Sequence, residues 1–323
     1  MIRIEINQNL LDYSVNFRKN LFLTRKRNFS KPKSGLKNLK KTFKTKAQLA
    51  IIDKIILDYE KLVEATPQKL LRFVNYYNKH YIDAFLKNNK ATKFSEAILK
   101  AMRYDALRDK EGIEIFSFLK IKTCIYCNSQ LTVTIEGESK KKAAKFEFDH
   151  FYPKSKYPFL ATSFFNLIPS CSNCNKTKGN KTFTKKTLFY LYTENKNELE
   201  QYAFKLDPKS QVDYWLTKDT NSIKFSFIDI SGAESSMSKK HNKLFSIQSI
   251  YNTQTDIIEE LFHIHEAYTK ANQKSMTKNL EALFPDEAFI KRLLIGTYIE
   301  KNEIHKRPLT KFRQDIARDL GLI

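Results

Sequence analysis

Two close pairs of cysteines constrain the fold of this chain more than any other feature of its sequence. Cys124 and Cys127 form the first pair, Cys171 and Cys174 form the second, and 43 residues lie between them. A gap of two residues lets both thiolates of a pair bind one metal ion, and four thiolates complete the tetrahedral shell of a structural zinc ion. Because the pairs use every cysteine of the chain, we expect a structural Zn²⁺ site. The alternative is four buried or free thiols.

The net charge indicates the kind of partner that the protein binds. Lys and Arg number 57 against 35 Asp and Glu, which gives a net charge of +22 over 323 residues. Such an excess favours nucleic acid, with an anionic membrane surface as the rival. However, the sequence has no stretch of about 18 apolar residues that could span a membrane. It also begins without the basic and apolar regions of a signal peptide. We therefore expect a cytoplasmic protein with no membrane partner, in which paired cysteines bind metal rather than form disulfides.

The spacing of apolar residues divides the chain into three regions. Residues 1–120 hold a basic arm and helical patterns, residues 121–182 change to strands around the cysteines, and residues 183–323 return mainly to helices. Helices are expected at 49–63, 67–77, 95–106, 257–264, 289–294 and 309–320, and strands at 1–6 and 223–230. The expected fold class is α+β: a predominantly helical chain with a small zinc core at its centre.

The basic arm covers residues 18–46 and holds twelve cations and no carboxylate. Aromatic side chains alternate with these charges, namely Phe17, Phe22, Phe29 and Phe43. Segments that follow a nucleic-acid groove combine cations and stacking rings in this way, so we expect the arm to contact nucleic acid. The alternative is a solvated, mobile segment. A second lysine cluster at 140–145 is expected in a hairpin that faces phosphates, with simple solvation as the alternative.

The segment between the cysteine pairs carries further polar residues. Asp149 and His150 end an apolar strand, and Asn166 precedes the second pair. Adjacent side chains of a regular strand point to opposite faces, so Asp149 and His150 can face one site only if the backbone bends, which Pro153 makes plausible. On a helix, Asn175 shares one face with the second cysteine pair and Lys178.

The order Cys-x-x-Cys, Asp-His, Asn, Cys-x-x-Cys-Asn-x-x-Lys-Gly resembles the HNH endonucleases whose ββα-metal core is built on a treble-clef zinc site. The resemblance covers residues 121–182. It implies the following roles: His150 as general base, Asp149 and Asn175 as ligands of a catalytic divalent ion, Asn166 as a brace of the loop that holds the base, and Lys178 as a cation near the phosphate. Asn175 stands where many relatives have histidine, which favours Mg²⁺ or Mn²⁺ as the catalytic ion.

These residue types suit phosphodiester hydrolysis. A neutral imidazole can take a proton from water near pH 7, and a cation held by oxygen ligands compensates charge on the phosphate. The expected activity is therefore a metal-dependent endonuclease, with DNA favoured as substrate. The alternatives are a four-cysteine zinc module that binds nucleic acid without cutting it, and an HNH nuclease that acts on structured RNA such as tRNA.

A looser resemblance concerns the C-terminal helices. Residues 244–261 and 305–321 look like the helical parts of Septu-type PtuB proteins, HNH nucleases of bacterial antiphage systems. This resemblance implies an ATPase partner and an activity that stays silent until infection. One HNH site cuts one strand, so double-strand cleavage would need two chains or two events, and the oligomeric state is left open.

Overall fold

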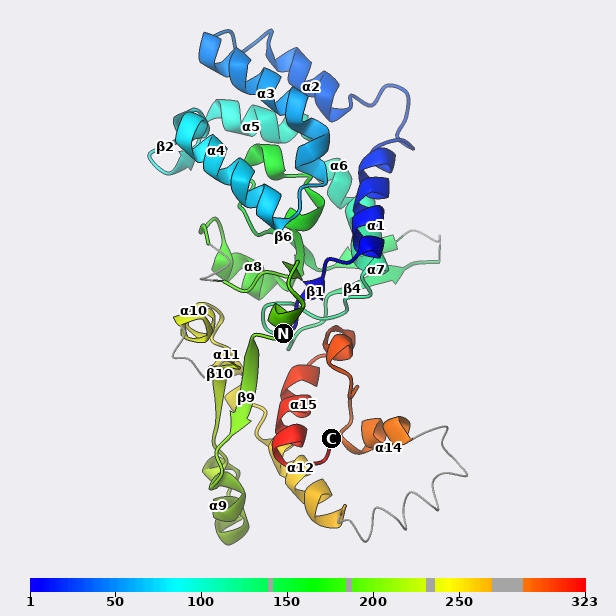
Figure 1. Ribbon diagram of the computed structural model, residues 1–323, viewed down its shortest axis with the longest axis vertical. Coiled ribbons are helices and arrows are strands. Elements are labelled where there is room, and N and C mark those ends of the chain that lie inside the picture. Colours follow the sequence, from blue (N-terminus) through cyan, green and yellow to red (C-terminus); the bar gives the residue numbers. More distant parts are fainter. Residues whose placement is uncertain (139–141, 184–187, 231–235, 269–286) are drawn as a thin grey trace.

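The computed structural model describes residues 1–138, 142–183, 188–230, 236–268 and 287–323 as an elongated molecule of two lobes (Figure 1). Helices make up most of both lobes, and the described strands form five sheets of two strands each. The predicted α+β class is confirmed. No helix among these residues is long and apolar enough to cross a membrane.

Helices α1 to α7 form most of the upper lobe. Their bounds are α1 (Gln8–Asn20), α2 (Pro32–Leu39), α3 (Lys46–Val63), α4 (Pro67–Phe85), α5 (Lys93–Ala101), α6 (Tyr104–Arg108) and α7 (Glu111–Phe118). Thr45 caps α3, since its hydroxyl accepts a hydrogen bond from the Gln48 amide at 3.2 Å. Thr66 precedes Pro67, the first residue of α4, where a proline loses no hydrogen bond because first-turn amides have no partner in the helix. Both helices agree with the sequence prediction.

The basic arm is folded into the upper lobe. It forms the end of α1, a turn and α2. Phe17 is 9% exposed and Phe22 is 1% exposed, while Phe29 and Phe43 pack against the hydrophobic core. The prediction that these rings stack on nucleic acid is therefore wrong, because the chain turns them inward and leaves most of the arm's lysines exposed. Contact between these lysines and nucleic acid stays a prediction.

A residue with positive φ divides the helix predicted at 95–106. Helix α5 ends at Ala101 and α6 begins at Tyr104, because Arg103 between them has a φ of 60°. Arg103 is held there by a distant contact: its Nε donates to the Ser30 carbonyl at 2.8 Å. The local apolar spacing carries no sign of this bond, so it predicts one helix where two exist.

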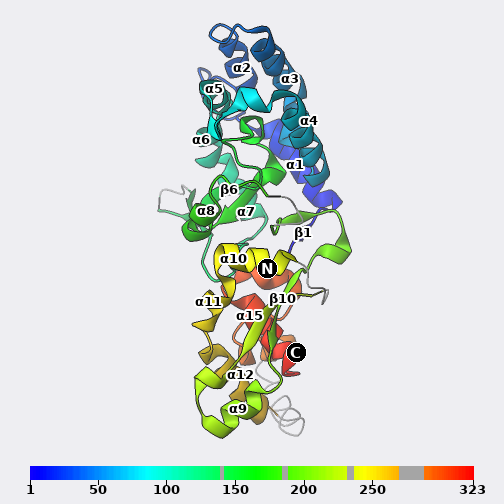
Figure 2. The same ribbon diagram turned by 90° about the vertical axis from the view of Figure 1, so that its left-hand side faces the viewer.

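The centre of the molecule contains both cysteine pairs. Strands β4 (Val133–Glu136) and β5 (Lys142–Lys145) form an antiparallel hairpin, β6 (Glu147–His150) pairs antiparallel with β7 (Leu167–Ser170), and α8 (Ser172–Lys178) follows. Both views place α8 beside β6 (Figures 1 and 2). The predicted ββα core is thus present. Gly112 of α7 lets β6 approach, since a Cβ there would lie 2.6 Å from the ring of Phe148.

Strands β9 (Tyr202–Leu206) and β10 (Phe225–Asp229) form the centre of the lower lobe. Around them lie α9 (Ser210–Thr217), α10 (Ser236–Phe245), α11 (Ile247–Asn252), α12 (Asp256–Ala267), α14 (Glu287–Leu294), the 3₁₀ helix η5 (Lys301–Lys306) and α15 (Thr310–Asp319). Helix α15 packs on β9, where Asp315 accepts a hydrogen bond from the Phe204 amide at 2.9 Å and Asp319 accepts one from the Leu206 amide at 2.8 Å. The strand and the three helices predicted for this region are confirmed.

The N-terminal strand lies between the two lobes (Figure 1). Strand β1 (Ile4–Glu5) pairs in parallel with β8 (Tyr192–Thr193). Nε2 of the buried His305 donates a hydrogen bond to the Ile2 carbonyl at 2.7 Å. The strand predicted at residues 1–6 is confirmed over two residues, and its remaining contacts tie it to the C-terminal region.

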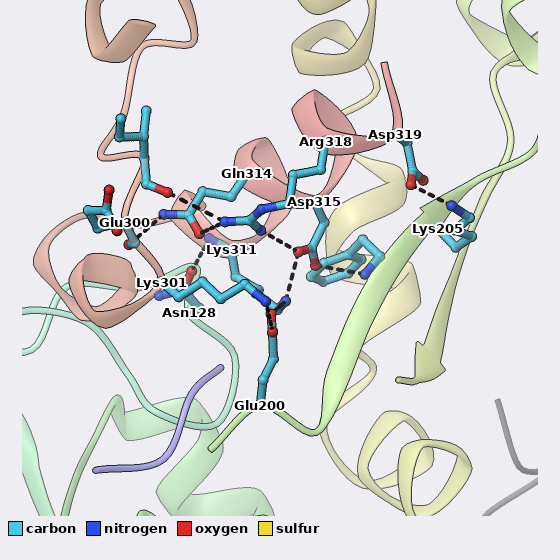
Figure 3. Close-up of polar contacts among 12 residues, drawn as sticks. Asn128, Glu200, Lys205, Glu300, Lys301, Lys311, Gln314, Asp315, Arg318 and Asp319 are labelled. Carbon is cyan, nitrogen blue, oxygen red and sulfur yellow. Dashed lines mark hydrogen bonds and ion pairs between the residues drawn. The ribbon is translucent and has the colours of Figure 1, made fainter. Parts of the chain in front are cut away.

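A buried polar network joins the centre of the molecule to the lower lobe (Figure 3). The Lys311 side chain is 1% exposed, and its ammonium pairs with Asp315 at 2.7 Å and with Glu200. Asn128, which directly follows the first cysteine pair, accepts a hydrogen bond from the Lys311 amide at 3.0 Å and donates one to the Ile304 carbonyl at 3.0 Å. The loop of the first cysteine pair is therefore fixed to the C-terminal helix.

Candidate active site and zinc site

The two cysteine pairs meet in one buried cluster. The four Sγ atoms of Cys124, Cys127, Cys171 and Cys174 all lie within 4.8 Å of one another, and none forms a disulfide. Zn–S bonds of about 2.3 Å in a tetrahedron place sulfur atoms roughly 3.8 Å apart, so this cluster fits a structural zinc ion. Cys171 also caps α8, because its Sγ accepts a hydrogen bond from the Cys174 amide at 3.4 Å. The second cysteine pair thereby determines where α8 begins.

Two side chains from the lower lobe complete the surroundings of this cluster. The Tyr251 hydroxyl donates to the Cys127 carbonyl at 2.8 Å, and Nε2 of His241 lies 2.7 Å from the Tyr126 carbonyl. Both residues are fully buried. His241 has no recognisable partner in the sequence; in the structure it fixes the backbone of the first cysteine pair.

Asp149 is a buried carboxylate between the zinc cluster and α8. Oδ2 accepts a hydrogen bond from the Tyr126 hydroxyl at 2.6 Å, and Oδ1 pairs with the ammonium of Lys178 at 2.9 Å. Burial raises the pKa of Asp149 and lowers the pKa of Lys178, and the attraction between the two groups opposes both shifts. The residue Asp149 is 5% exposed. Each carboxylate oxygen keeps a lone pair that neither the Tyr126 nor the Lys178 hydrogen bond uses.

His150 points away from the zinc cluster, toward the loop that follows β6. Its Nε2 lies 3.0 Å from the Ala161 carbonyl, so Nε2 carries the proton and Nδ1 holds the lone pair. Nδ1 has no hydrogen-bond partner among the described residues. It is not fully buried, so it keeps some contact with solvent. Burial, together with the nearby charges of Lys154 and Lys178, lowers the pKa of His150 to about 3. The imidazole is therefore neutral at pH 7.

Asn166 lies under the loop between β6 and β7 and is fully buried. Its Oδ1 accepts a hydrogen bond from the Tyr152 amide at 2.8 Å. Its Nδ2 donates to the carbonyls of Tyr152 and Leu160, both at 3.1 Å. These three bonds fix the backbone just before Ala161, whose carbonyl holds His150. The geometry is that of a brace and gives Asn166 no contact with substrate.

Asn175 sits on the face of α8 that carries Cys171, Cys174 and Lys178. Its carboxamide is half-buried and makes no hydrogen bond with the described residues, so its oxygen is available to an ion. Helix α8 ends at Gly179, whose φ of 52° and ψ of −140° belong to a region that is accessible almost exclusively to glycine.

Lys178 lies inside the protein rather than beside a substrate. Its side chain is 0% exposed, and Nζ donates to Asp149 Oδ1 at 2.9 Å and to the His150 carbonyl at 2.7 Å. This differs from the expected position near the phosphate, because a buried ammonium cannot reach a bound strand. The charge of Lys178 instead compensates Asp149 and holds the end of α8 against β6.

Sequence reasoning missed two residues of this site. Tyr126 lies inside the first Cys-x-x-Cys, and its hydroxyl bonds to Asp149. Lys154 lies in the turn after β6 with its ammonium 4.4 Å from the centroid of the Tyr104 ring, and that ring lies 4.8 Å from the imidazole of His150. Lys154 is half-buried and keeps solvent contact. The only sequence feature that points to Lys154 is its position in the Pro-Lys-Ser turn directly after the Asp-His pair.

Comparisons with known proteins define the class of this centre. Residues 124–181 match the family model described as HNH endonuclease, which confirms the resemblance expected from the motif order. Over 56 residues the chain is 43% identical to the Septu protein PtuB of Bacillus thuringiensis. This stretch is 17% of the present chain and 19% of that protein. No solved structure is significantly similar to the chain.

Proposed function

We propose that the protein is a metal-dependent endonuclease that hydrolyses phosphodiester bonds, with DNA as the favoured substrate. The observation that carries this proposal is the state of His150 within the segment that matches the HNH family. One ring nitrogen is bonded to a backbone carbonyl, and the other is unpartnered and retains a lone pair. The structural histidines His241 and His305 also leave Nδ1 without a partner, but there the atom is fully buried, whereas Nδ1 of His150 is not among the fully buried atoms.

His150 would accept the proton of the attacking water at Nδ1. The bond from Nε2 to the Ala161 carbonyl fixes the tautomer and the ring plane, and this bond becomes stronger as the ring gains charge. General-base catalysis of this kind contributes typically 10²- to 10⁴-fold to a rate. The low pKa of the free protein keeps the base unprotonated, and a bound anionic substrate would raise that pKa by favouring the imidazolium.

Asp149 and Asn175 would hold the Mg²⁺ or Mn²⁺ ion, since both offer side-chain oxygens next to the same face of α8. The ion, when bound, supplies charge compensation for the phosphate and the leaving oxygen. Tyr126 and Lys178 orient the Asp149 carboxylate through one hydrogen bond to each oxygen. Lys154 would contact the phosphate in the place expected of Lys178, because it lies near His150 and keeps solvent contact.

A second candidate function is a zinc module that binds nucleic acid without cutting it. It is favoured by two observations: both oxygens of Asp149 already have partners, and His150 is only 3% exposed. Under this hypothesis the Asp149–Lys178 pair is a structural ion pair, and no divalent ion enters the site.

The similarity to PtuB supports a role as the nuclease of a bacterial antiphage system, with an ATPase as partner protein. This similarity covers a fifth of that relative, so the pathway and the partner are inferred from the family resemblance. Pull-down of the full chain with proteins encoded beside it would test the partner.

The decisive experiment compares the zinc-loaded wild-type protein with His150→Ala on plasmid, linear duplex, single strands and total tRNA. Mg²⁺ or Mn²⁺ is added or omitted. We expect metal-dependent cleavage by the wild type and a loss of at least 100-fold in His150→Ala, with unchanged zinc content and a protein that is still folded at the assay temperature. His263→Ala, a substitution of an exposed histidine in α12, is the matched control. Absence of cleavage of every substrate by the wild type, with binding retained, would favour the binding module.

A further inference from the structure

A cleft of about 600 Å³ lies between the β4–β5 hairpin, α7 and the C-terminal region. It is lined by four lysines, Lys120, Lys122, Lys142 and Lys306, and by one carboxylate, Glu136. Its floor is apolar and includes Phe116 and Ile121. We call it the hairpin cleft. Its lining extends beyond residues 124–181, the segment that matches the HNH family.

The lining of the hairpin cleft has more cations than carboxylates. Lys120, Lys122 and Lys142 are exposed, and none of them forms an ion pair with the described residues. Lys306 pairs with Glu303 at 2.6 Å. Elsewhere in the protein, cations near carboxylates are paired, as in the network around Lys311. Glu136 lies opposite Lys142 in the β4–β5 register, so the lining keeps a net positive charge that comes mainly from Lys120 and Lys122, and this charge favours an anion as the ligand.

A tyrosine holds further cations at the edge of the hairpin cleft. The ring centroid of Tyr298 lies 3.9 Å from the guanidinium carbon of Arg292, 5.2 Å from that of Arg307 and 4.9 Å from the ammonium of Lys306. An aromatic ring positions a cation through its quadrupole without cancelling the charge, whereas a carboxylate would cancel it. Neither arginine forms an ion pair with the described residues. Both guanidinium groups are therefore ordered and still free to bind an anion.

The walls of the hairpin cleft are fixed before any ligand binds. Gln314, fully buried in α15, donates to the Glu300 carbonyl at 2.9 Å (Figure 3). It also donates to the Tyr298 carbonyl at 2.8 Å. On the opposite wall, the amide of Lys122 donates to the His305 carbonyl at 2.8 Å. A rigid site loses little conformational freedom when a ligand binds. These contacts thus hold the backbone at Tyr298, Glu300 and Lys122 in place beside the cleft.

We propose that the hairpin cleft binds the phosphate backbone of a nucleic-acid strand, beyond the point of cleavage. Guanidinium groups and ammonium groups bind phosphate oxygens strongly and without regard to base sequence. An extended polyanion suits cations that are spread over both lobes, and the apolar floor suits sugars and bases. The identity of the ligand rests on the proposed function, but the binding itself does not require that the protein cuts. An acidic segment of a partner protein is the competing ligand.

The test measures the binding of labelled 20-nucleotide single strands and duplexes by fluorescence anisotropy. The full-length, zinc-loaded protein carries His150→Ala, so that hydrolysis cannot intervene. The variant Lys120→Gln/Lys122→Gln/Lys142→Gln is compared with Lys61→Gln/Lys69→Gln/Lys79→Gln, which removes three exposed charges from α3 and α4. Equal melting temperatures verify the fold of both variants.

We expect the cleft variant to lose at least tenfold in affinity at 0.1 M salt, while the control loses less than threefold. The slope of log K against log[salt] should fall by about 2 for single strands, since each phosphate contact contributes about 0.7. The preference between single strand and duplex identifies the form that is bound.

Equal losses of nucleic-acid affinity in the two variants would overturn the proposal, because nonspecific attraction to the net positive charge of the protein would then explain binding. Unchanged nucleic-acid affinity with lost binding of a polyglutamate peptide would also overturn it, in favour of an acidic protein partner. Failure of the wild type to cut, with these affinity differences intact, would contradict the nuclease proposal and leave the cleft assignment standing.

Discussion

Substitution of Asn166 by alanine gives the sharpest test of how the candidate active site is held. Asn166 is fully buried and makes three side-chain hydrogen bonds. Alanine would leave the amide and the carbonyl of Tyr152 without partners, whereas the Leu160 carbonyl keeps its bond from the Ser163 amide. Each buried unpartnered group costs about 1–3 kcal/mol. We therefore expect the free energy of unfolding to fall by about 3–5 kcal/mol.

The assay is equilibrium urea unfolding, followed by circular dichroism at a fixed excess of zinc. The matched control is Asn173→Ala, an exposed asparagine in the first turn of α8, for which we expect a change within about 0.5 kcal/mol. Cleavage should also fall in Asn166→Ala under conditions where the protein is still folded, because the Ala161 carbonyl that orients His150 loses its support. A loss of stability below about 1 kcal/mol in Asn166→Ala would refute the assignment of this residue as the brace of the loop.

Three further predictions concern zinc, helix geometry and pH. Cys174→Ser should lower zinc content and melting temperature together, as measured by atomic absorption and calorimetry, since structural zinc contributes directly to folding; full zinc retention would contradict the four-cysteine site. Gly179→Ala should lower the free energy of unfolding, measured in urea, by about 1–3 kcal/mol, because alanine would be strained in the backbone conformation of this residue. The loss should exceed that in Gly321→Ala, since a Cβ added at Gly321, which has a φ of 70°, would meet no atom within 4 Å. Burial lowers the pKa of His305 to about 4 in the folded protein. As the pH drops from about 6.5 to about 4, the histidine is protonated in the unfolded state but not in the folded state, so the free energy of unfolding falls by about 3 kcal/mol. His305→Asn should flatten this part of the pH–stability curve relative to His263→Asn, and parallel curves would refute the assignment.

The sequence predicts the central module well because its geometry is set by short spacings. Two residues between cysteines suffice to bring both sulfur atoms to one ion, and four positions along a helix suffice to place Asn175 on the same face as Cys171. Most helices and strands outside the module follow from apolar periodicity in the same way. In each case the relevant interaction lies within a few residues of its cause.

The remaining features depend on contacts between distant parts of the chain. Lys178 pairs with a carboxylate 29 residues away, and His305 contacts a carbonyl 303 residues away. The phenylalanines of the basic arm face inward because the surrounding helices offer them a core, which no pattern within residues 18–46 reveals. The charge and aromatic content of this arm predict exposed rings that bind nucleic acid, but packing against the surrounding helices buries these rings in the core.

The attachment of the first cysteine pair to the lower lobe has a consequence for transfer of the segment that matches the HNH family into another protein. Tyr251, His241 and Lys311 all contact the loop at Tyr126 to Asn128 from outside the family segment. A peptide cut at the family boundaries would expose the Tyr126 and Cys127 carbonyls, the Asn128 side chain and the ring of Tyr126 to water. This segment therefore depends on the rest of the chain, and a chimera that preserves the geometry of its cysteine cluster must include the C-terminal helices as well.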